Sequence, residues 1–473
     1  MKHLKFLYPV IIFTFFQTHA QTITNFKLKQ LIETNSRLSK SFVGVSVFDL
    51  KNDREILAYN SDKNFVPASV LKLLYTLSAI ETKGKDYKFK TEIAYTGKIL
   101  FDGTLEGNLI ITPSGDPAFG SSRFYKNGYK SILKTIKDIL TKSGIRCIEG
   151  NIILVLAKQS YPVHGSWTTE DIGNYYAGGS WGLNFNENLY KLKFSLGDKV
   201  GSQTKILNIS PKIPYLVLKN NVTVGEKASG DNSYIYGLPY DFHREIKGTL
   251  PLGKKTFTIK GSIPNPPLTF LSLLADYFDD NNIYFKDYDI SKKGFRNTTK
   301  IHTFESPELL QIVKTCNNWS INLYSEALSK LLCLHSNHPA DYLYEEEIKK
   351  FFNKYKTDFT NTQIVDGCGL SSENHISPKT LTLFIKEMTD KLGLFTVLDI
   401  LPKARIEGYA KNIPIKDLWI KSGSIRGVLN YSGVFKGKKG NYYAFSIMTN
   451  NNNTNIKIKS DIFGLITQLI KYI

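Results

Sequence analysis

The pattern of apolar residues and glycines along the chain changes twice. These two changes limit the architecture more than any other feature of the sequence. From about Lys85, short β-rich segments broken by glycines follow one another, among them TEIAYTGKIL, GTLEGNLIIT and GNIILVLA. The region ends at the proline cluster IPNPPLTF (263–270), which cannot continue a central strand, and helical periodicity resumes in LTFLSLLADYF. We therefore expect a β-rich insertion at 86–264 inside a domain formed by 21–85 and 265–473.

The two flanking parts combine strands with helices. FVGVSVFDL (42–50) and EILAYN (55–60) form a predicted hairpin, and leucines at helical spacing after Pro67 predict a helix that begins at or near Ser69. The later part holds helical segments, then a meander of strands, LWIKSGS, GVLNYSGVFKG and NYYAFSIMTN, and a final amphipathic helix, SDIFGLITQLIKYI. We predict an α/β (α+β) core. Its last helix is expected to pack on the sheet, and peripheral membrane contact stays an alternative.

The first twenty residues resemble a secretory signal. Lys2, His3 and Lys5 form a basic start, an apolar stretch runs over 6–16, and small residues precede a cleavage point after Ala20. An uncleaved anchor is the alternative. We expect an exported protein whose mature chain starts near Gln21, in the periplasm or cell envelope.

Charge and cysteine usage exclude other classes. The chain has 61 Lys+Arg against 42 Asp+Glu, a net charge of +19, but no dense basic block or zinc-finger spacing. Nucleic acid is therefore not an expected partner, whereas an anionic wall or membrane surface is. The four scattered cysteines, with no Cys-x-x-Cys pair, leave one or two disulfides or four free thiols open and argue against a zinc site.

Ser69 and Lys72 form the first candidate catalytic pair. Positions i and i+3 share one face of a helix, so the two side chains are expected within reach of each other. A serine hydroxyl needs a base to become a nucleophile, and a lysine serves when burial or a neighbouring cation lowers its pKa. The Ser-x-x-Lys spacing alone is a weak signal.

Two further elements strengthen this pair. Ser320 and Asn322 open a helical segment, where a hydroxyl can relay a proton and an amide can hold a lysine or a substrate carbonyl. Lys421-Ser422-Gly423 lies on the predicted strand LWIKSGS and offers a positive charge, a hydroxyl donor and room for a substrate backbone. The backbone N–H groups of Ser69 and Ser424 form a possible oxyanion hole.

Several other motifs are weaker candidates. Gly178–Gly182 fits Gly-x-Ser-x-Gly, but no helix start follows it. His335 and His338 lie in a loop-like stretch, and Gly115-Asp116-Pro117 is typical of a tight turn. His164 and His375 have no evident acidic partner in the sequence.

Together the motifs resemble the class C, low-molecular-mass penicillin-binding proteins, the D-alanyl-D-alanine carboxypeptidase/endopeptidase family. PASVLK, NNWSINLYSEAL and IKSGSIRGVLNYSGVF match its three motifs in order, and GNLIITPSGDPAF, WTTEDIGNYYA, LNFNEN and DGCGLSSENHISP match further blocks. The resemblance covers essentially the whole mature chain. It implies a transpeptidase/β-lactamase-like core, an antiparallel sheet flanked by helices, with two small nested domains inserted after the first motif; their inner boundary stays open.

The resemblance also implies roles. Ser69 attacks the penultimate D-alanine of a peptidoglycan stem peptide, Lys72 takes its proton, and Ser320 and Lys72 pass a proton to the leaving amine. Asn322 belongs to the second motif of this catalytic set. Lys421, Ser422, Gly423 and Ser424 hold the substrate carboxylate or backbone. Asp171 resembles a residue that reaches the stem-peptide side chain. No metal or cofactor is expected, and β-lactam antibiotics are expected to bind covalently.

Four positions depart from the family pattern, and rival functions remain. Ile321 stands where Asp is usual, Ser422 where Thr is commoner, Cys368 where Ser is usual and Ser372 where Arg is common. A β-lactamase or esterase on the same core, or a wall-binding protein without catalysis, are the alternatives. The preference between carboxypeptidase and endopeptidase action, the third stem residue and the oligomeric state are left open by the sequence.

Overall fold

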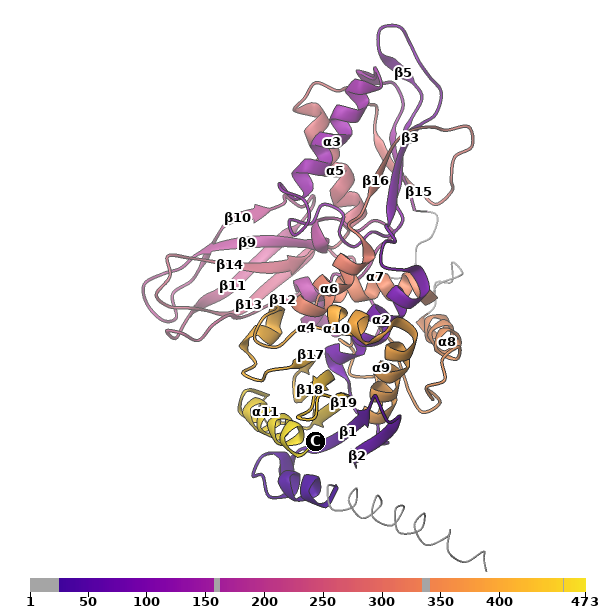
Figure 1. Ribbon diagram of the computed structural model, residues 1–473. Helices are drawn as coiled ribbons and strands as arrows, with labels where there is room; N and C mark the ends of the chain where they lie inside the picture. The colour runs from indigo at the N-terminus through magenta and orange to yellow at the C-terminus, as the bar shows by residue number, and fades with distance from the viewer. Residues whose placement is uncertain (1–24, 157–161, 334–340, 454) are drawn as a thin grey trace, which may run out of the picture. The chain divides into compact units, whose positions relative to one another are not determined.

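The computed structural model describes residues 25–156, 162–333, 341–453 and 455–473 (Figure 1). The predicted signal segment and the pair His335 and His338 lie outside the described residues. The chain divides into two compact units. The first unit contains 1–83, 313–320 and 345–473, and the second contains 84–312 and 321–344.

The first unit is built on one antiparallel sheet. Its five strands are ordered β17-β18-β19-β1-β2, so the N-terminal hairpin and the C-terminal meander join in one sheet, as predicted. The strands are β1 (Phe42–Asp49), β2 (Arg54–Tyr59), β17 (Leu418–Ile425), β18 (Val428–Lys436) and β19 (Tyr442–Asn450). Strand β17 forms one edge of the sheet.

The side chains of β1 point alternately to the two faces of this sheet, and helices pack against both faces. Val43, Val45 and Val47 enter a core with the apolar side of α11 (Asn455–Tyr472) and the helix at 25–33. Gly44 faces the other way, toward Pro378 at the start of α9 (Pro378–Leu392). Helix α9 packs on β1 and β19 and also contacts α2 (Lys72–Lys83) and α10 (Leu394–Ile400).

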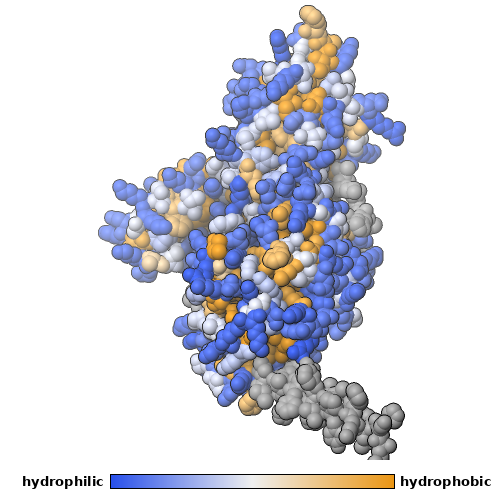
Figure 2. Space-filling model, viewed as in Figure 1, coloured by the Kyte–Doolittle hydropathy of each residue, from blue (hydrophilic) through white to orange (hydrophobic). Residues whose placement is uncertain are grey.

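Helix α11 packs on the sheet, as expected. Its apolar residues are buried in the same core as the strands; they are Ile458, Ile462, Leu465, Ile466 and Leu469. Among the described residues no helix is long and apolar enough to cross a membrane. Hydrophilic residues are spread over the visible face of the protein (Figure 2).

The described residues of the second unit form four sheets. The largest is ordered β15-β8-β6-β3-β16, and the others are ordered β10-β9-β14, β11-β13-β12 and β4-β5-β7. The strands of the largest are β3 (Lys90–Tyr95), β6 (Leu109–Thr112), β8 (Ile152–Val155), β15 (Tyr288–Ser291) and β16 (Thr299–Glu305). The others are β4 (Lys98–Ile99), β5 (Thr104–Glu106), β7 (Cys147–Ile148), β9 (Leu189–Ser195), β10 (Lys205–Ser210), β11 (Val217–Gly225), β12 (Asn232–Tyr236), β13 (His243–Pro251) and β14 (Thr256–Ser262).

Two features of this unit differ from the sequence expectation. The β-rich stretch contains a long helix, α3 (Tyr129–Lys142), which packs with α5 (Pro266–Asp279) in the core of the largest sheet. The observed division also does not fall at residue 265. Residues 265–312 lie in the second unit because β15 pairs with β8 and β16 pairs with β3.

Helices α6 (Leu309–Trp319), α7 (Asn322–Cys333) and α8 (Asp341–Phe352) follow one another along the chain. Helix α6 carries the chain into the first unit, α7 lies in the second unit, and α8 leads back to the first. Ser320 is the last residue of the short first-unit segment, and Asn322 begins α7. All four cysteines are free thiols, so the alternative of disulfides is wrong.

Candidate active site

Ser69 lies in a short turn of 3-10 helix, η2 (Ala68–Leu71), that leads directly into α2 at Lys72. Its neighbours Ala68, Val70 and Leu71 are fully buried, which fixes the turn, while Ser69 itself is partly exposed. Ala68 adopts a left-handed backbone conformation with φ of 48°, a strained state for a residue with a side chain. Such strain is common where a backbone must present a reactive side chain.

Lys72 and Ser69 are in direct contact. The Nζ atom of Lys72 donates a hydrogen bond to Ser69 Oγ at 2.7 Å and another to the carbonyl oxygen of Cys368 at 2.6 Å. The Lys72 side chain is completely buried. This contact is of the kind that a serine hydroxyl needs with a base before it can act as a nucleophile.

The loop that supplies the carbonyl of Cys368 is held by one buried carboxylate. Asp366 accepts hydrogen bonds from the backbone N–H groups of Cys368, Gly369 and Ser371, at 3.2, 2.7 and 2.7 Å. Gly369 lies so close to the turn η2 that a Cβ atom there would be 2.0 Å from the Ala68 oxygen. Sequence reasoning noted the DGCGLS block but did not assign it this contact.

Lys421 is the second buried amine of the first unit. Its Nζ donates to Ser320 Oγ at 2.9 Å and to the Ser422 carbonyl at 2.6 Å. Burial lowers the pKa of Lys421 well below that of an ordinary lysine. The nearby Lys72 lowers it further, and Cys316 acts in the opposite direction. Ser320 follows α6 with φ of 54°, a left-handed backbone conformation like that of Ala68.

Gly423 brings strand β17 against the turn η2. A Cβ atom at this position would lie 2.8 Å from the amide nitrogens of Ser69 and Val70 and 2.7 Å from the Pro67 oxygen. Any side chain here would therefore displace Ser69. Ser69, Lys72, Ser320, Lys421 and Gly423 thus meet in the first unit although their segments are far apart in the sequence.

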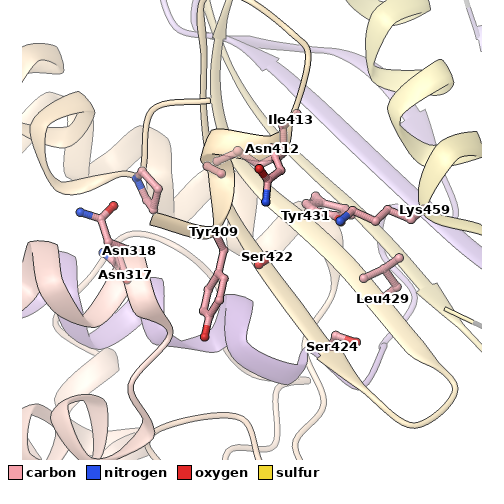
Figure 3. Close-up of a pocket in the computed structure, with 13 residues that line it drawn as sticks. Asn317, Asn318, Tyr409, Asn412, Ile413, Ser422, Ser424, Leu429, Tyr431 and Lys459 are labelled. Carbon is pink, nitrogen blue, oxygen red and sulfur yellow. The ribbon is translucent and has the colours of Figure 1, made fainter. Parts of the chain in front are cut away.

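A hollow of about 330 Å³ lies beside this part of β17 (Figure 3). Ser422 and Ser424 line it, together with Tyr409 and Asn412 from the segment before β17. Asn317 and Asn318 at the end of α6 also line it, and the buried Oδ1 atoms of both lack a hydrogen-bond partner.

Asn322 and Asp171 lie in the second unit and are linked there by one tyrosine. Asn322 Nδ2 donates to the Tyr176 carbonyl at 2.8 Å, and the Tyr176 hydroxyl donates to Asp171 Oδ1 at 3.0 Å. Asp171 lies in α4 (Thr169–Ile172), just before the turn η3 (Tyr175–Ala177). Tyr176 is a residue that sequence reasoning missed, although it stands in the WTTEDIGNYYA block.

Helix α7 holds this segment at two more places. His164 Nε2 and Glu326 Oε2 are 3.0 Å apart and both side chains are buried, so the expectation that His164 lacks an acidic partner is wrong. Lys330 donates to the Ser180 carbonyl. Since Asn322, Glu326 and Lys330 are spaced four residues apart, they share one side of α7.

The weaker candidates from the sequence have other surroundings. Ser180 is buried in a loop with no helix directly after it, which is unlike a nucleophile elbow. Asp116 is buried in the second unit, and burial raises its pKa to about 7. His375 Nδ1 faces the Glu373 carbonyl at 2.8 Å rather than a carboxylate.

Known proteins with the same fold were found among solved structures. Penicillin-binding protein 4 (DacB) from Haemophilus influenzae matches with a TM-score of 0.76 and 23% sequence identity, over 91% of this chain and 93% of that one. A second structure of that protein, complexed with a β-lactam, also has a TM-score of 0.76. The predicted penicillin-binding fold with additional sheets is therefore confirmed.

Sequence comparison points the same way. The D-alanyl-D-alanine carboxypeptidase DacB of Haemophilus influenzae is 24% identical over 419 residues, 86% of this chain and 84% of that protein. The D-alanyl-D-alanine carboxypeptidase of Actinomadura sp. strain R39 is 21% identical over 440 residues, 86% of this chain and 77% of that protein. The model of the D-Ala-D-Ala carboxypeptidase 3 (S13) family matches residues 24–469. The chain belongs to the S13 family of D-Ala-D-Ala carboxypeptidases.

Proposed function

We propose that Ser69 is the nucleophile and Lys72 the general base of this serine-type D-Ala-D-Ala carboxypeptidase. The observation that carries the proposal is the 2.7 Å contact between Lys72 Nζ and Ser69 Oγ, made by a completely buried amine. The second bond of Lys72, to the rigid carbonyl of Cys368, fixes the direction of its Nζ atom. Cys368 acts through its backbone, so a thiol in place of the family's usual serine hydroxyl leaves this contact intact.

The proposed reaction has two halves. Lys72 in its neutral form takes the hydroxyl proton, and Ser69 Oγ attacks the carbonyl carbon of the penultimate D-alanine to give a tetrahedral intermediate. The backbone N–H groups of Ser69 and Ser424 stabilise its oxyanion. Lys72 then passes this proton by way of Ser320 to the departing amine of the terminal D-alanine, the C–N bond breaks, and the acyl-enzyme forms. Lys72, neutral again, takes a proton from the water that attacks the ester and returns it to Ser69 Oγ as the shortened stem peptide leaves with a free carboxylate.

The same geometry suggests how substrate is held. Lys421 and the Ser422 hydroxyl receive the terminal carboxylate, and the substrate backbone extends along the edge strand β17. Asn322, Tyr176 and Asp171 hold the side chain of the stem peptide. This proposal rests on the linked bonds of these three residues in the second unit.

We further propose an exported enzyme of the periplasm or cell envelope that is acylated by β-lactams. The basic and apolar start of the chain supports export. The β-lactam complex of the related Haemophilus influenzae protein supports acylation.

The test is the release of D-alanine from a peptide that ends in D-Ala-D-Ala. We expect Ser69→Ala to lower kcat by at least about 10³-fold, because the covalent step is lost. Ser78→Ala, a matched change of a buried serine on α2, is the control and should keep nearly full activity. Retention of more than a tenth of the activity in Ser69→Ala would reject the assignment, and rapid turnover of penicillin would favour a β-lactamase.

A further inference from the structure

The second unit contains a hollow that the proposed reaction does not use. It has a volume of about 360 Å³ and is lined by residues from the start of α3, from β9 and β14, and from the segment between β10 and β11. Four cationic side chains line it: Arg123, Lys126, Lys191 and Lys260. Positive charge in a concave site focuses an attractive field on anions.

The one carboxylate of the hollow is already occupied. Glu187 accepts hydrogen bonds from Ser121 Oγ at 2.6 Å, from Arg123 Nε at 2.9 Å and from the Tyr324 hydroxyl at 2.9 Å. Glu187 therefore balances the charge of Arg123. No further acidic side chain among the described lining residues balances the charge of the three lysines.

Two independent features show that positive charge accumulates at this hollow. The pKa of Lys260 is lowered, by burial first and then by the charges of Arg123 and Lys191, with Glu187 acting in the opposite direction. The 14-residue helix α3 begins at the hollow, with Gly128 as its N-cap and no side-chain cap bond. An uncapped helix N-terminus carries partial positive charge.

The positions of the cationic groups in the hollow indicate which kind of anion fits there. The ammonium groups come from three separate segments of the chain, and the guanidinium of Arg123 is already bonded through Nε. This arrangement suits several separated carboxylates better than one compact phosphate, which prefers a focused donor fork. We propose that the hollow binds the carboxylates of an acidic peptide, namely a peptidoglycan stem peptide other than the one being cleaved. The choice of peptide rests on the proposed function, whereas the anion site does not.

A muropeptide that has already lost both D-alanines tests this site without catalysis. Its affinity for the full chain should fall about tenfold in the triple variant Lys126→Gln, Lys191→Gln, Lys260→Gln. The control variant Lys227→Gln, Lys286→Gln, Lys292→Gln removes the same charge from exposed lysines of the same unit that do not line the hollow, and should change affinity less than twofold. The acylation rate with penicillin should be unchanged in both, which separates this proposal from the catalytic one.

Two chemical probes complete the experiment. The same muropeptide with amidated carboxylates should bind the wild-type chain as weakly as the unmodified one binds the triple variant. Equal binding of the amidated and free forms would overturn the proposal, and so would equal effects of the two triple variants. Binding of inorganic phosphate in the absence of muropeptide binding would also overturn it, in favour of a phosphate ligand.

Discussion

At the scale of single residues, the site depends on backbone contacts as much as on side chains. Lys72 is directed by the carbonyl of Cys368, which is 296 positions away in the sequence. No pattern of residue types predicts such a contact, because any residue supplies a carbonyl. The Ser69–Lys72 contact was predictable, since helical spacing places them on one face.

Gly423 gives a sharp prediction at this scale. Gly423→Ala places a Cβ atom 2.8 Å from the backbone nitrogens of Ser69 and Val70, which cannot move aside independently of the nucleophile. We expect kcat for D-alanine release to fall on the order of 10²-fold. Gly464→Ala is the matched control, because a Cβ atom there meets nothing within 4 Å. Wild-type kcat in Gly423→Ala would show that β17 does not position Ser69.

The lowered pKa of Lys421 predicts that the stability of the fold depends on pH. Because its pKa is lowered by burial, the folded chain binds fewer protons here than the unfolded chain, in a pH window that extends from the lowered pKa up to about 10.5. Stability therefore rises with pH through this window. Denaturant unfolding should show the wild type gaining stability relative to Lys421→Met between pH 7 and 10, while the variant lacks activity throughout. A pH-independent difference would contradict the lowered pKa.

At the scale of elements, periodicity predicted the first unit better than the second. The strands of the sheet and helices α2, α9 and α11 follow clear apolar patterns and were expected. Helix α3 was missed in a stretch read as β-rich, although its buried residues Ile132, Leu133, Ile136, Ile139 and Leu140 have helical spacing. The division at 265 failed because strand pairing between distant segments, such as β16 with β3, leaves no local signal.

Helix α7 acts as one element that holds the segment at 164–180. Glu326→Ala removes the buried contact of the carboxylate with His164 Nε2 and should cost about 2 kcal/mol of stability, because a buried polar contact is lost. We also expect kcat/KM to fall, because Asn322 and Tyr176 lose support from the same helix face. Glu326→Gln keeps an acceptor for His164 and should restore most of both quantities. If thermal unfolding and kinetics are unchanged in Glu326→Ala, the pair does not support the site.

At the scale of the whole molecule, a net charge of +19 accompanies an enzyme whose substrate belongs to the cell wall. The sequence predicted the family and fold of nearly the entire chain because three motifs occur in order and each stands on a suitable element. It did not predict the basic hollow of the second unit, because its lysines come from segments that only folding brings together.

The most direct measurement is the site of acylation by penicillin. The purified full chain is incubated with a fluorescent penicillin, digested, and the labelled peptide is sequenced by mass spectrometry. The account predicts one stoichiometric label on Ser69, lost in Ser69→Ala and strongly slowed in Lys72→Ala. A label on Ser320, Ser180 or another residue, or no label on the wild-type chain, would contradict it.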